Sequence, residues 1–431
     1  MRINLAYGRE GLAVDLPEKS GHNPIDIIRP QFVPGLPDEP AAIRQALRAP
    51  IASPPLARLV KPGDSVVIVH TDITRATPND RLLPVLLAEL EEAGIDRQEI
   101  TLLNGLGTHR PQSDRELRLL LGDQIVENYR CLQHDCNDDD NLLPLGDTAQ
   151  GHPVRINRTY LEADVKILTG FIEPHFFAGF SGGPKAILPS LAGAESVFTN
   201  HGIKMIAHPK SAWAITEGNP IWEEMRDVAL RTRPTFLLNV ALNAHRQITG
   251  LFAGDMLAAH AEGCRFVKEK AMAGVAQEYD IVLTTNSGYP LDQNLYQAVK
   301  GMSAASQVVR QGGAIVIAAD CEDGLPDHGR YAELLALGGS PQGILELISQ
   351  PGFSEQDQWQ VQIQAQIQLK ATVHVYSENL TPDQIIKALF VPSYSIEQTV
   401  MELIELAGPD CRLCIIPEGP QTIPYLSPGS P

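Results

Sequence analysis

The stretch DVKILTGFIEPHFFAGFSGGPK, residues 164–185, carries both a strand signal and a ligand-binding signal. Its first seven residues form a short apolar run that is typical of a buried strand. In the turn that follows, glycines 179, 182 and 183 can adopt positive φ and approach a ligand closely. Pro184 suits the first turn of a helix, whose free N–H groups attract anions. Lys185 then lies in that first turn, where it could act as a nucleophile or a covalent anchor.

Strand-like runs alternate with helical patterns on both sides of this stretch. The alternation predicts βαβ units and an α/β fold with a mostly parallel sheet. The expected buried strands are SVVIVH (65–70), EITLLNG (99–105), DVKILTG (164–170) and TFLLNVAL (235–242), and the expected helices are NDRLLPVLLAELEEAG (79–94) and DRELRLLLG (114–122). Ligands of such sheets bind at the carboxyl ends of the strands. The loops TDITR, GTHR and FIEPH begin there, so we expect them to converge on one crevice.

A second domain is predicted after a helix at 256–274 that could bridge the two. The expected strands of that domain are YDIVLTTNS (279–287), GAIVIAADC (313–321) and ATVHVYSE (371–378). We therefore expect a Rossmann-like N-terminal domain over 1–270, completed by a return of the segment 396–431. A smaller α/β domain would occupy 275–395, with the active site in the cleft between the domains.

Composition describes a soluble globular protein. The chain has 431 residues, 43% of them hydrophobic and 20% charged, and a net charge of −18. This acidity argues against nucleic acid or an anionic membrane as partner, because either would require a basic face. The chain has no apolar run of the roughly 20 residues that span a bilayer, and the N-terminus lacks the pattern of a signal peptide. We expect a cytoplasmic protein.

Six scattered cysteines are too few for a disulfide framework in a chain of this length. Cys411 and Cys414 form a C-x-x-C, but they lie in an apolar run that resembles a strand, with no second cysteine pair nearby. We interpret them as two buried thiols, with a redox or zinc role as the alternative.

The segment HTDITRATP (70–78) places an acidic residue, two threonines and an arginine after a predicted strand. The turn from Asp72 through Ile73 and Thr74 to Arg75 offers N–H groups for a phosphate, and Arg75 can hold a carboxylate or phosphate bidentately. The alternative is that Asp72 caps the next helix and pairs with Arg75.

The segment GLGTHRP (105–111) resembles half of a dinucleotide-binding fingerprint, but Arg110 stands in place of the third glycine. Nicotinamide binding is therefore weakly supported. His109, at the end of a strand, is placed for proton transfer, since imidazole titrates near neutral pH. A structural loop histidine is the alternative.

His175 and His201 flank Lys185, and with His109 they give three imidazoles near the predicted crevice. Three such ligands plus water could bind zinc, but zinc sites often contain a close pair such as H-x-x-x-H, which is missing here. The wide spacing favours separate roles, with one ligand and two acid–base groups.

In the second domain, SGYPLDQNLYQAVKG (287–301) leads a loop into a helix. Tyr296 and Lys300 share a face at i, i+4, and Gln297 lies beside Lys300 at i, i+3. Lys300 could supply a second cation for an anionic substrate. The alternative is a solvated lysine on an amphipathic helix.

Taken together, these segments resemble the nickel-dependent lactate racemase family over nearly the whole chain. Proteins of that family carry a nickel-pincer nucleotide, a pyridinium-3,5-bisthiocarboxylic acid mononucleotide that binds nickel through two sulfurs and a ring carbon. The motifs that carry the resemblance are HTDITRATP, GLGTHRP, PHFFAGFSGGPK (174–185), TNH (199–201) and LYQAVKG (295–301).

For this sequence the resemblance implies that Lys185 forms the covalent thioamide link and that His201 is the protein ligand to nickel. His109 and His175 would be the alternating acid and base. The family's cofactor-contacting residues also match Asp72, Ile73, Thr74 and Arg75. Its substrate-contacting residues match Arg75, Tyr296, Gln297, Lys300 and Trp359.

The implied reaction is racemisation or epimerisation of a 2-hydroxy acid by hydride transfer to and from the cofactor. Simple removal of the C2 proton next to an ionised carboxylate would face a high barrier, whereas hydride transfer passes through a planar 2-oxo acid. Two imidazoles are needed because the enantiomers present their hydroxyls to opposite sides. Loading of the cofactor would depend on separate maturation enzymes.

Several alternatives stay open at this point. Lactate or another short aliphatic 2-hydroxy acid is favoured by the aromatic surroundings of His175, whereas a dicarboxylate would need another cation, for which Arg110 is a candidate. A zinc-dependent hydrolase using His109, His175 and His201 is a second enzyme class. A non-catalytic protein that binds a small acid or the cofactor is a third possibility.

Overall fold

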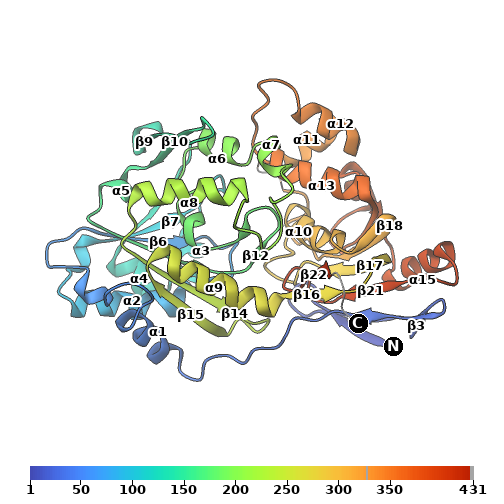
Figure 1. Ribbon diagram of the computed structural model, residues 1–431, viewed down its shortest axis with the longest axis horizontal. Coiled ribbons are helices and arrows are strands. Elements are labelled where there is room, and N and C mark those ends of the chain that lie inside the picture. Colours follow the sequence, from blue (N-terminus) through green and yellow to red (C-terminus); the bar gives the residue numbers. More distant parts are fainter. Residues whose placement is uncertain (327–328, 428–431) are drawn as a thin grey trace. The chain divides into compact units, whose positions relative to one another are not determined.

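The computed structural model describes residues 1–326 and 329–427 and forms two compact units (Figure 1). We call the first the central unit, made of Phe32–His201 and Ala207–Glu269. The second is the terminal unit, which contains Met1–Gln31, Gly202–Ile206 and the chain from Lys270 onwards. Both are built on a six-stranded sheet, so the predicted α/β class with two domains is confirmed.

The sheet of the central unit has the strand order β15-β14-β11-β6-β7-β8. Only β15 runs antiparallel to its neighbour. The strands are β6 (Val66–Thr71), β7 (Ile100–Gly105), β8 (Arg130–Gln133), β11 (Val165–Phe171), β14 (Phe236–Leu242) and β15 (Ile248–Gly254). The inner strands β6, β7, β11 and β14 are the four that the apolar runs predict, because buried parallel strands have apolar side chains on both faces.

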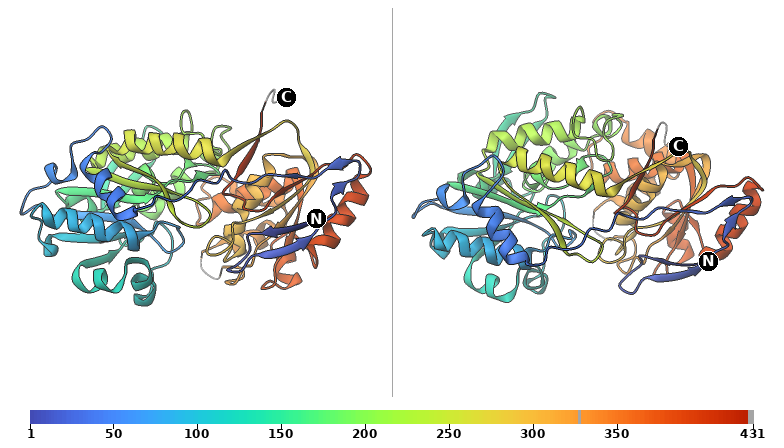
Figure 2. Two further views of the ribbon diagram at one scale, coloured as in Figure 1. Left: turned by 90° about the horizontal axis from the view of Figure 1, so that it is seen from below. Right: turned by 60° about the horizontal axis from the view of Figure 1, so that its bottom comes forward.

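Helices cover both faces of this sheet. On one face, apolar side chains of α1 (Glu39–Arg48), α2 (Asn79–Glu92) and α3 (Asp114–Leu121) pack with those of the strands in a single core. Figure 2 shows α8 (Pro220–Thr232) and α9 (Met256–Ala271) on the other face. The remaining helices and strands are α4 (Asp123–Asn128), β9 (Leu142–Asp147), β10 (Pro153–Asn157), α5 (Arg158–Glu162), β12 (Pro174–His175), β13 (Gly179–Phe180) and α6 (Ala194–Asn200), with short 3-10 turns η1 (Leu56–Arg58), η2 (Arg97–Glu99), η3 (Asp139–Asn141) and η4 (Gly183–Ala186).

The sheet of the terminal unit is parallel throughout, with the order β20-β19-β18-β17-β21-β5. Its strands are β5 (Asp26–Ile27), β17 (Tyr279–Thr285), β18 (Val309–Ala318), β19 (Ala371–Tyr376), β20 (Val391–Pro392) and β21 (Leu413–Ile416). The helices are α7 (Ile203–Ile206), α10 (Leu295–Ser306), α11 (Tyr331–Gly338), α12 (Pro341–Ile348), α13 (Gln358–Lys370), α14 (Pro382–Lys387) and α15 (Ile396–Ala407). Short paired strands complete the unit: β1 (Arg2–Leu5), β2 (Leu12–Asp15), β3 (Lys19–Ser20), β4 (Asn23–Pro24), β16 (Met272–Val275) and β22 (Ile423–Leu426).

The path of the chain ends differs from the expected domain boundaries. The segment 396–431 was expected to return to the N-terminal domain, but its strand β21 lies between β17 and β5 in the terminal sheet. All four residues of β21 are buried, so the strand needs a partner on each edge, and these two strands supply them. Residues 1–31 also belong to the terminal unit, whereas the expected N-terminal domain began at residue 1.

The cysteine prediction is confirmed. Cys411 and Cys414 are free thiols that are almost fully buried, and burial raises the pKa of the Cys414 thiol.

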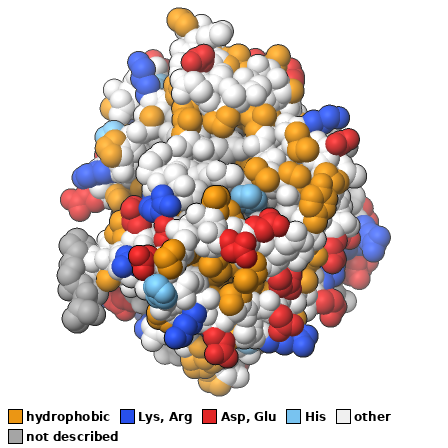
Figure 3. Space-filling model, turned by 90° about the vertical axis from the view of Figure 1, so that its right-hand side faces the viewer, with side chains coloured by type: hydrophobic (Ala, Val, Ile, Leu, Met, Phe, Trp, Pro, Cys, Tyr) orange, Lys and Arg blue, Asp and Glu red, His pale blue; other side chains and the backbone are white. Residues whose placement is uncertain are grey.

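No helix in the described part of the chain is long and apolar enough to cross a bilayer. On the face drawn in Figure 3, Lys and Arg side chains are scattered among Asp and Glu side chains, as far as the described residues reach.

Candidate active site

Three loops of the central unit leave one edge of the sheet, where β6, β7 and β11 end. In the parallel register Thr71 pairs with Gly105, and Leu168 with Val69, so the carboxyl ends of these strands lie side by side. The loop after β7 contacts both of the other segments. His109 bonds to Asp72, and the N–H of Gly107 donates to the carbonyl of Ser190, just after η4 (2.9 Å). These contacts bring together segments that the sequence places far apart.

The Asp72–Arg75 turn is held by its own side chains. Asp72 Oδ1 accepts hydrogen bonds from the N–H and the hydroxyl of Thr74 at 3.2 and 2.7 Å, and Arg75 Nη1 donates to Thr74 Oγ1 at 2.9 Å. Burial acts to raise the pKa of the Asp72 carboxyl, but the neighbouring His109, Arg75 and Thr74 outweigh it and hold that pKa well below its usual range. Asp72 does not cap α2, which begins after Pro78 without a side-chain cap.

Asp72 also orients His109. Its Oδ2 lies 2.5 Å from Nδ1 of the imidazole, and the carboxylate is buried whereas about a third of the His109 side chain is exposed. A carboxylate at this distance fixes the proton on Nδ1 and leaves Nε2 to exchange a proton with a ligand. The pair therefore has the arrangement of an oriented acid–base histidine.

The ring of Phe177 is the common neighbour of three predicted site residues. The His175 ring lies 4.5 Å from it and the His201 ring 5.0 Å, centroid to centroid, while Lys185 Nζ is 5.5 Å from the ring centre. His175 Nδ1 accepts from the N–H of Ala178 at 3.3 Å. A neutral His175 then carries its proton on Nε2.

His201 follows the last turn of α6. Its N–H donates to Val197 at 2.8 Å, and 4% of the residue is exposed. Burial, and then the charge of Lys185, lower the pKa of His201 to about 3. The imidazole is therefore neutral around pH 7, which is the state that ligates a metal ion.

The glycine turn before Lys185 requires its glycines. Gly182 and Gly183 have φ of +75° and +53°, and the N–H of Gly183 donates to Asn239 Oδ1 at 2.9 Å. A Cβ atom at Gly183 would lie 2.5 Å from the ring of His260. The backbone thus passes so close to its neighbours that no side chain fits.

The expected helix at Pro184 is a single 3-10 turn, η4. It spans Gly183–Ala186, and Pro189, which lacks an N–H donor, follows soon after. A turn of four residues does not provide the helix start that was expected to attract anions next to Lys185. The neighbouring imidazole and Phe177 ring define its environment instead.

In the terminal unit, α10 carries three of the predicted substrate residues. Asn294 caps this helix by accepting from the N–H of Gln297 at 3.0 Å. Tyr296 meets Trp359 of α13, whose Nε1 donates to the tyrosine hydroxyl at 3.0 Å. Gln297 is buried and Lys300 is half-buried. The structure therefore brings Trp359 next to Tyr296, although 63 residues separate them.

Residues that support the site from a distance carry no local sequence signal. Asn239 holds the glycine turn, and His260 packs beneath it and bonds to the carbonyl of Ser181 at 3.0 Å. Both lie more than 50 residues from that turn, within ordinary apolar strand and helix patterns.

The three predicted imidazoles form no zinc site. Among residues 1–326 and 329–427, no three His, Cys, Asp or Glu side chains group closely enough to hold a metal ion. The three-ligand cluster that a zinc hydrolase would use is therefore not among the described residues. The geometry fits separate roles for the histidines.

Comparisons with known proteins identify the family of the chain. Residues 7–214 match the lactate racemase N-terminal domain and residues 275–423 the lactate racemase C-terminal domain. The chain is 33% identical to a lactate racemase of Thermoanaerobacterium thermosaccharolyticum, covering 98% of each chain. It is 35% identical to a lactate racemase of Lactiplantibacillus plantarum, covering 88% of this chain and 90% of the relative.

Two solved structures resemble this structure. The lactate racemase apoprotein from Thermoanaerobacterium thermosaccharolyticum superposes with a TM-score of 0.90 at 33% identity, covering 98% of this chain and all of that one. A Thermotoga maritima protein gives a TM-score of 0.68 at 18% identity, covering 92% of this chain and all of that one. The second likeness concerns the fold alone.

Proposed function

This chain belongs to the lactate racemase family, and from that premise we propose that it is an isomerase that interconverts the enantiomers of lactate or another short 2-hydroxy acid. The observation that carries the proposal is the gathering of His175, His201 and Lys185 around the ring of Phe177. The same unit supplies a fourth group, His109, already oriented by a buried carboxylate.

The residues around Phe177 fit a covalently held nickel-pincer nucleotide. Lys185 offers the amine for a thioamide link, and His201 is a buried, neutral imidazole that can ligate nickel. The turn at Gly182 and Gly183 lets the backbone approach a bulky group closely. Asp72, Ile73, Thr74 and Arg75 would contact the nucleotide. When bound, this group supplies a hydride acceptor and donor.

The two histidines that do not hold the cofactor, His109 and His175, would transfer the proton of the substrate hydroxyl. His109, with its proton fixed on Nδ1 by Asp72, can accept a proton at Nε2 from one enantiomer. His175 would take the proton of the other enantiomer at Nε2, and for this its neutral ring must first carry its proton on Nδ1 instead of accepting there from the N–H of Ala178. Each base would serve the enantiomer whose hydroxyl faces it, and the same group would act as the acid in the reverse direction.

The substrate carboxylate would be held by cations and amide groups. Arg75 offers a planar guanidinium, and Lys300 with Gln297 is proposed to contribute from α10. The bonded pair Tyr296 and Trp359 would supply an apolar wall with a polar edge.

The surroundings of His175 favour a short aliphatic substrate. The four neighbouring phenylalanines, Phe171, Phe176, Phe177 and Phe180, are all buried. Arg110, the candidate for binding a second carboxylate, is bonded to Glu116 through both terminal nitrogens (2.6 and 3.0 Å). A dicarboxylate would have to compete with that ion pair.

We further propose a cytoplasmic enzyme that depends on separate cofactor-making enzymes.

The test is racemisation by the loaded protein in deuterated water. The chain is produced together with the cofactor-making enzymes and incubated with single enantiomers of lactate and of longer 2-hydroxy acids. We expect the antipode to form with its original C2 hydrogen, because hydride returns from the cofactor to the same carbon. An antipode labelled with deuterium at C2 would mean proton exchange and refute the hydride route. Absence of any antipode from nickel-loaded protein would favour a binding role.

A further inference from the structure

Helix α8 begins at a residue that also holds the Phe177 backbone. Asn219 is fully buried and caps the helix by accepting from the N–H groups of Ile221 and Trp222 at 3.1 and 3.3 Å. Its Nδ2 donates to the carbonyl of Phe177 at 2.8 Å. The start of α8 is therefore attached to the residue whose ring lies against His175 and His201.

One turn further along α8, Glu224 bonds to the end of α6. Its Oε1 accepts from Nδ2 of Asn200 at 3.0 Å. Asn200 is the last residue of α6, and His201 follows it directly. A side chain of α8 thus holds the helix end that carries the proposed nickel ligand.

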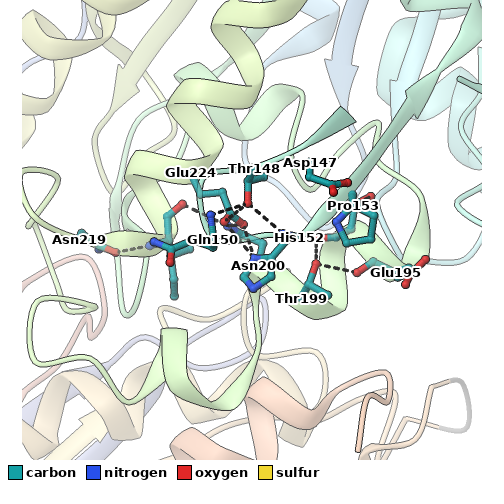
Figure 4. A network of polar contacts seen from close by, with 12 residues as sticks. Asp147, Thr148, Gln150, His152, Pro153, Glu195, Thr199, Asn200, Asn219 and Glu224 are labelled. Carbon is teal, nitrogen blue, oxygen red and sulfur yellow. Dashed lines mark hydrogen bonds and ion pairs between the residues drawn. The ribbon is translucent and has the colours of Figure 1, made fainter. Parts of the chain in front are cut away.

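The same carboxylate holds the β9–β10 hairpin, as Figure 4 shows. Glu224 Oε2 accepts from the hydroxyl of Thr148 at 2.9 Å and lies 3.0 Å from Nδ1 of His152. At its other end, α6 is bonded to this hairpin through Ser196, whose hydroxyl donates to the carbonyl of Pro153 at 2.9 Å. Helix α6 is therefore fixed between the hairpin and α8, with Glu224 as the common acceptor.

Burying a carboxylate to join three segments costs free energy, because the group loses its hydration. Only 5% of Glu224 is exposed, and an ionised group in such a place is tolerated when several donors satisfy it. Apolar side chains of the same size often join segments with equal or greater stability. The carboxylate instead forms directional hydrogen bonds, and each of these bonds fixes the position of the group that donates it.

We propose that Glu224 is a positioning residue that fixes His201, acting through Asn200 and the end of α6. The inference rests on the proposed function, in which His201 ligates nickel. Replacing the carboxylate by an amide keeps the volume of the side chain but turns one acceptor into a donor. That donor would face the donors of Thr148, His152 or Asn200, so the end of α6 loses part of its support.

The experiment compares Glu224→Gln with a matched control, Glu89→Gln. Glu89 is also 5% exposed, lies in the same unit and bonds to Arg48 at 2.9–3.0 Å, with no bond to the site residues named above. Both variants are produced with the cofactor-making enzymes. The measurements are kcat, KM, the melting temperature and the rate at which a chelator removes nickel from the loaded protein.

For Glu224→Gln we expect nickel loss about 10 to 100 times faster and a similar fall in kcat, with KM changed less than about twofold. Glu89→Gln should lower the melting temperature at least as much and leave kcat and nickel loss unchanged. The inference is overturned if Glu224→Gln retains wild-type nickel loss and kcat, or if both variants change them equally.

A measurement on the apoprotein separates this inference from the proposed function. The His201 N–H bonds to Val197 inside the last turn of α6, so its hydrogen exchange reports how firmly that turn is held. Exchange about 10 times faster in Glu224→Gln than in Glu89→Gln supports positioning, and equal exchange refutes it. If wild-type protein takes up no nickel and racemises nothing, the proposed function fails, and the exchange rates still decide the positioning claim.

Discussion

The bond between Asp72 and His109 provides a test of the acid–base assignment. Asp72→Asn keeps the size of the side chain but exchanges the charged acceptor for an amide, so His109 can turn or change its tautomer. We expect kcat to fall about 10- to 100-fold with a small change in KM. Asp64→Asn is the control, since Asp64 is also buried but bonds to the N–H of Lys61 (2.9 Å). An Asp72→Asn enzyme with wild-type kcat would contradict the assignment.

The same carboxylate links stability to acid. Because the pKa of Asp72 is lowered in the folded protein, its ionisation stabilises the fold fully above its unfolded pKa of about 4. That stabilisation is lost as the pH falls through the lower, folded value. Denaturation of the apoprotein should therefore show a gap between wild type and Asp72→Asn of about 1–3 kcal/mol at pH 6 that shrinks below pH 4. A gap that stays constant would contradict the lowered pKa.

Sequence reasoning finds residues that stand next to unusual local chemistry. His175 and Lys185 flank a glycine-rich turn, and His109 lies in the short loop that follows an apolar run, so each can be selected from its neighbours in the chain. Glu224 and His260 lie in helices whose patterns look ordinary. The contacts through which they support the site, to Asn200 and to the carbonyl of Ser181, span 24 and 79 residues, and no local pattern encodes such a contact.

At the scale of the element, the turn before Lys185 can be tested with alanine. Gly183→Ala would place a Cβ 2.5 Å from the His260 ring at a φ of +53°. Gly63→Ala is the matched control, because Gly63 also has positive φ but has open space around it. We expect the control to lose about 1 kcal/mol of stability from backbone strain alone. Gly183→Ala should lose more and should lose the mass increase that marks cofactor attachment. Equal behaviour of both variants would contradict a role for close packing.

Helix α13 shows where pattern reasoning reaches its limit. Its sequence QWQVQIQAQIQ alternates glutamine with apolar residues, and such alternation is typical of a strand. The segment is nevertheless a helix that is buried almost all round, and backbone carbonyls of neighbouring segments accept hydrogen bonds from the side-chain amides of its glutamines. Gln362 donates to Ile203 at 3.0 Å and Gln364 to Ala388 at 2.8 Å. Those acceptors lie outside α13, so the sequence of this segment alone could not show that it forms a buried helix.

Elements with a continuous apolar run or helical spacing were predictable to within a few residues. The expected strand 65–70 is β6 (Val66–Thr71), and the expected helix 79–94 is α2 (Asn79–Glu92). In contrast, β15 (Ile248–Gly254) escaped prediction, since three of its seven residues are only partly buried and its run is interrupted by Gly250.

At the scale of the whole molecule, the division into two units does not follow the order of the chain, because segments from both ends of the chain belong to the same unit. The short strand β5 near the N-terminus and β21 near the C-terminus are neighbours in the terminal sheet. Both strands are short, and β5 has only two residues, which form few backbone hydrogen bonds. The sequence pattern of such a short strand does not show which strand it pairs with. Their positions depend on the pairing of β21 with β17 and of β5 with β21, which exists only in the assembled sheet.

Three buried histidines make the central unit sensitive to acid. Burial lowers the pKa of His70 to about 4, that of His260 to about 4, and, together with Lys185, that of His201 to about 3. Between these values and the unfolded pKa of about 6.5, the unfolded chain binds protons that the folded chain does not. The free energy of unfolding should therefore be highest above pH 6.5 and fall by up to about 1.4 kcal/mol per pH unit for each histidine as the pH drops.

Urea denaturation of the apoprotein at pH 7 and pH 5 tests this. His260→Gln can still donate to the Ser181 carbonyl but cannot bind the proton, so its loss of stability between the two pH values should be about 2 kcal/mol smaller than that of wild type. His245→Gln, at an exposed position, should lose as much as wild type. If His260→Gln instead follows the wild-type loss, His260 is protonated in the folded state. The packing of the imidazole beneath Gly183 would then have to accommodate a charge.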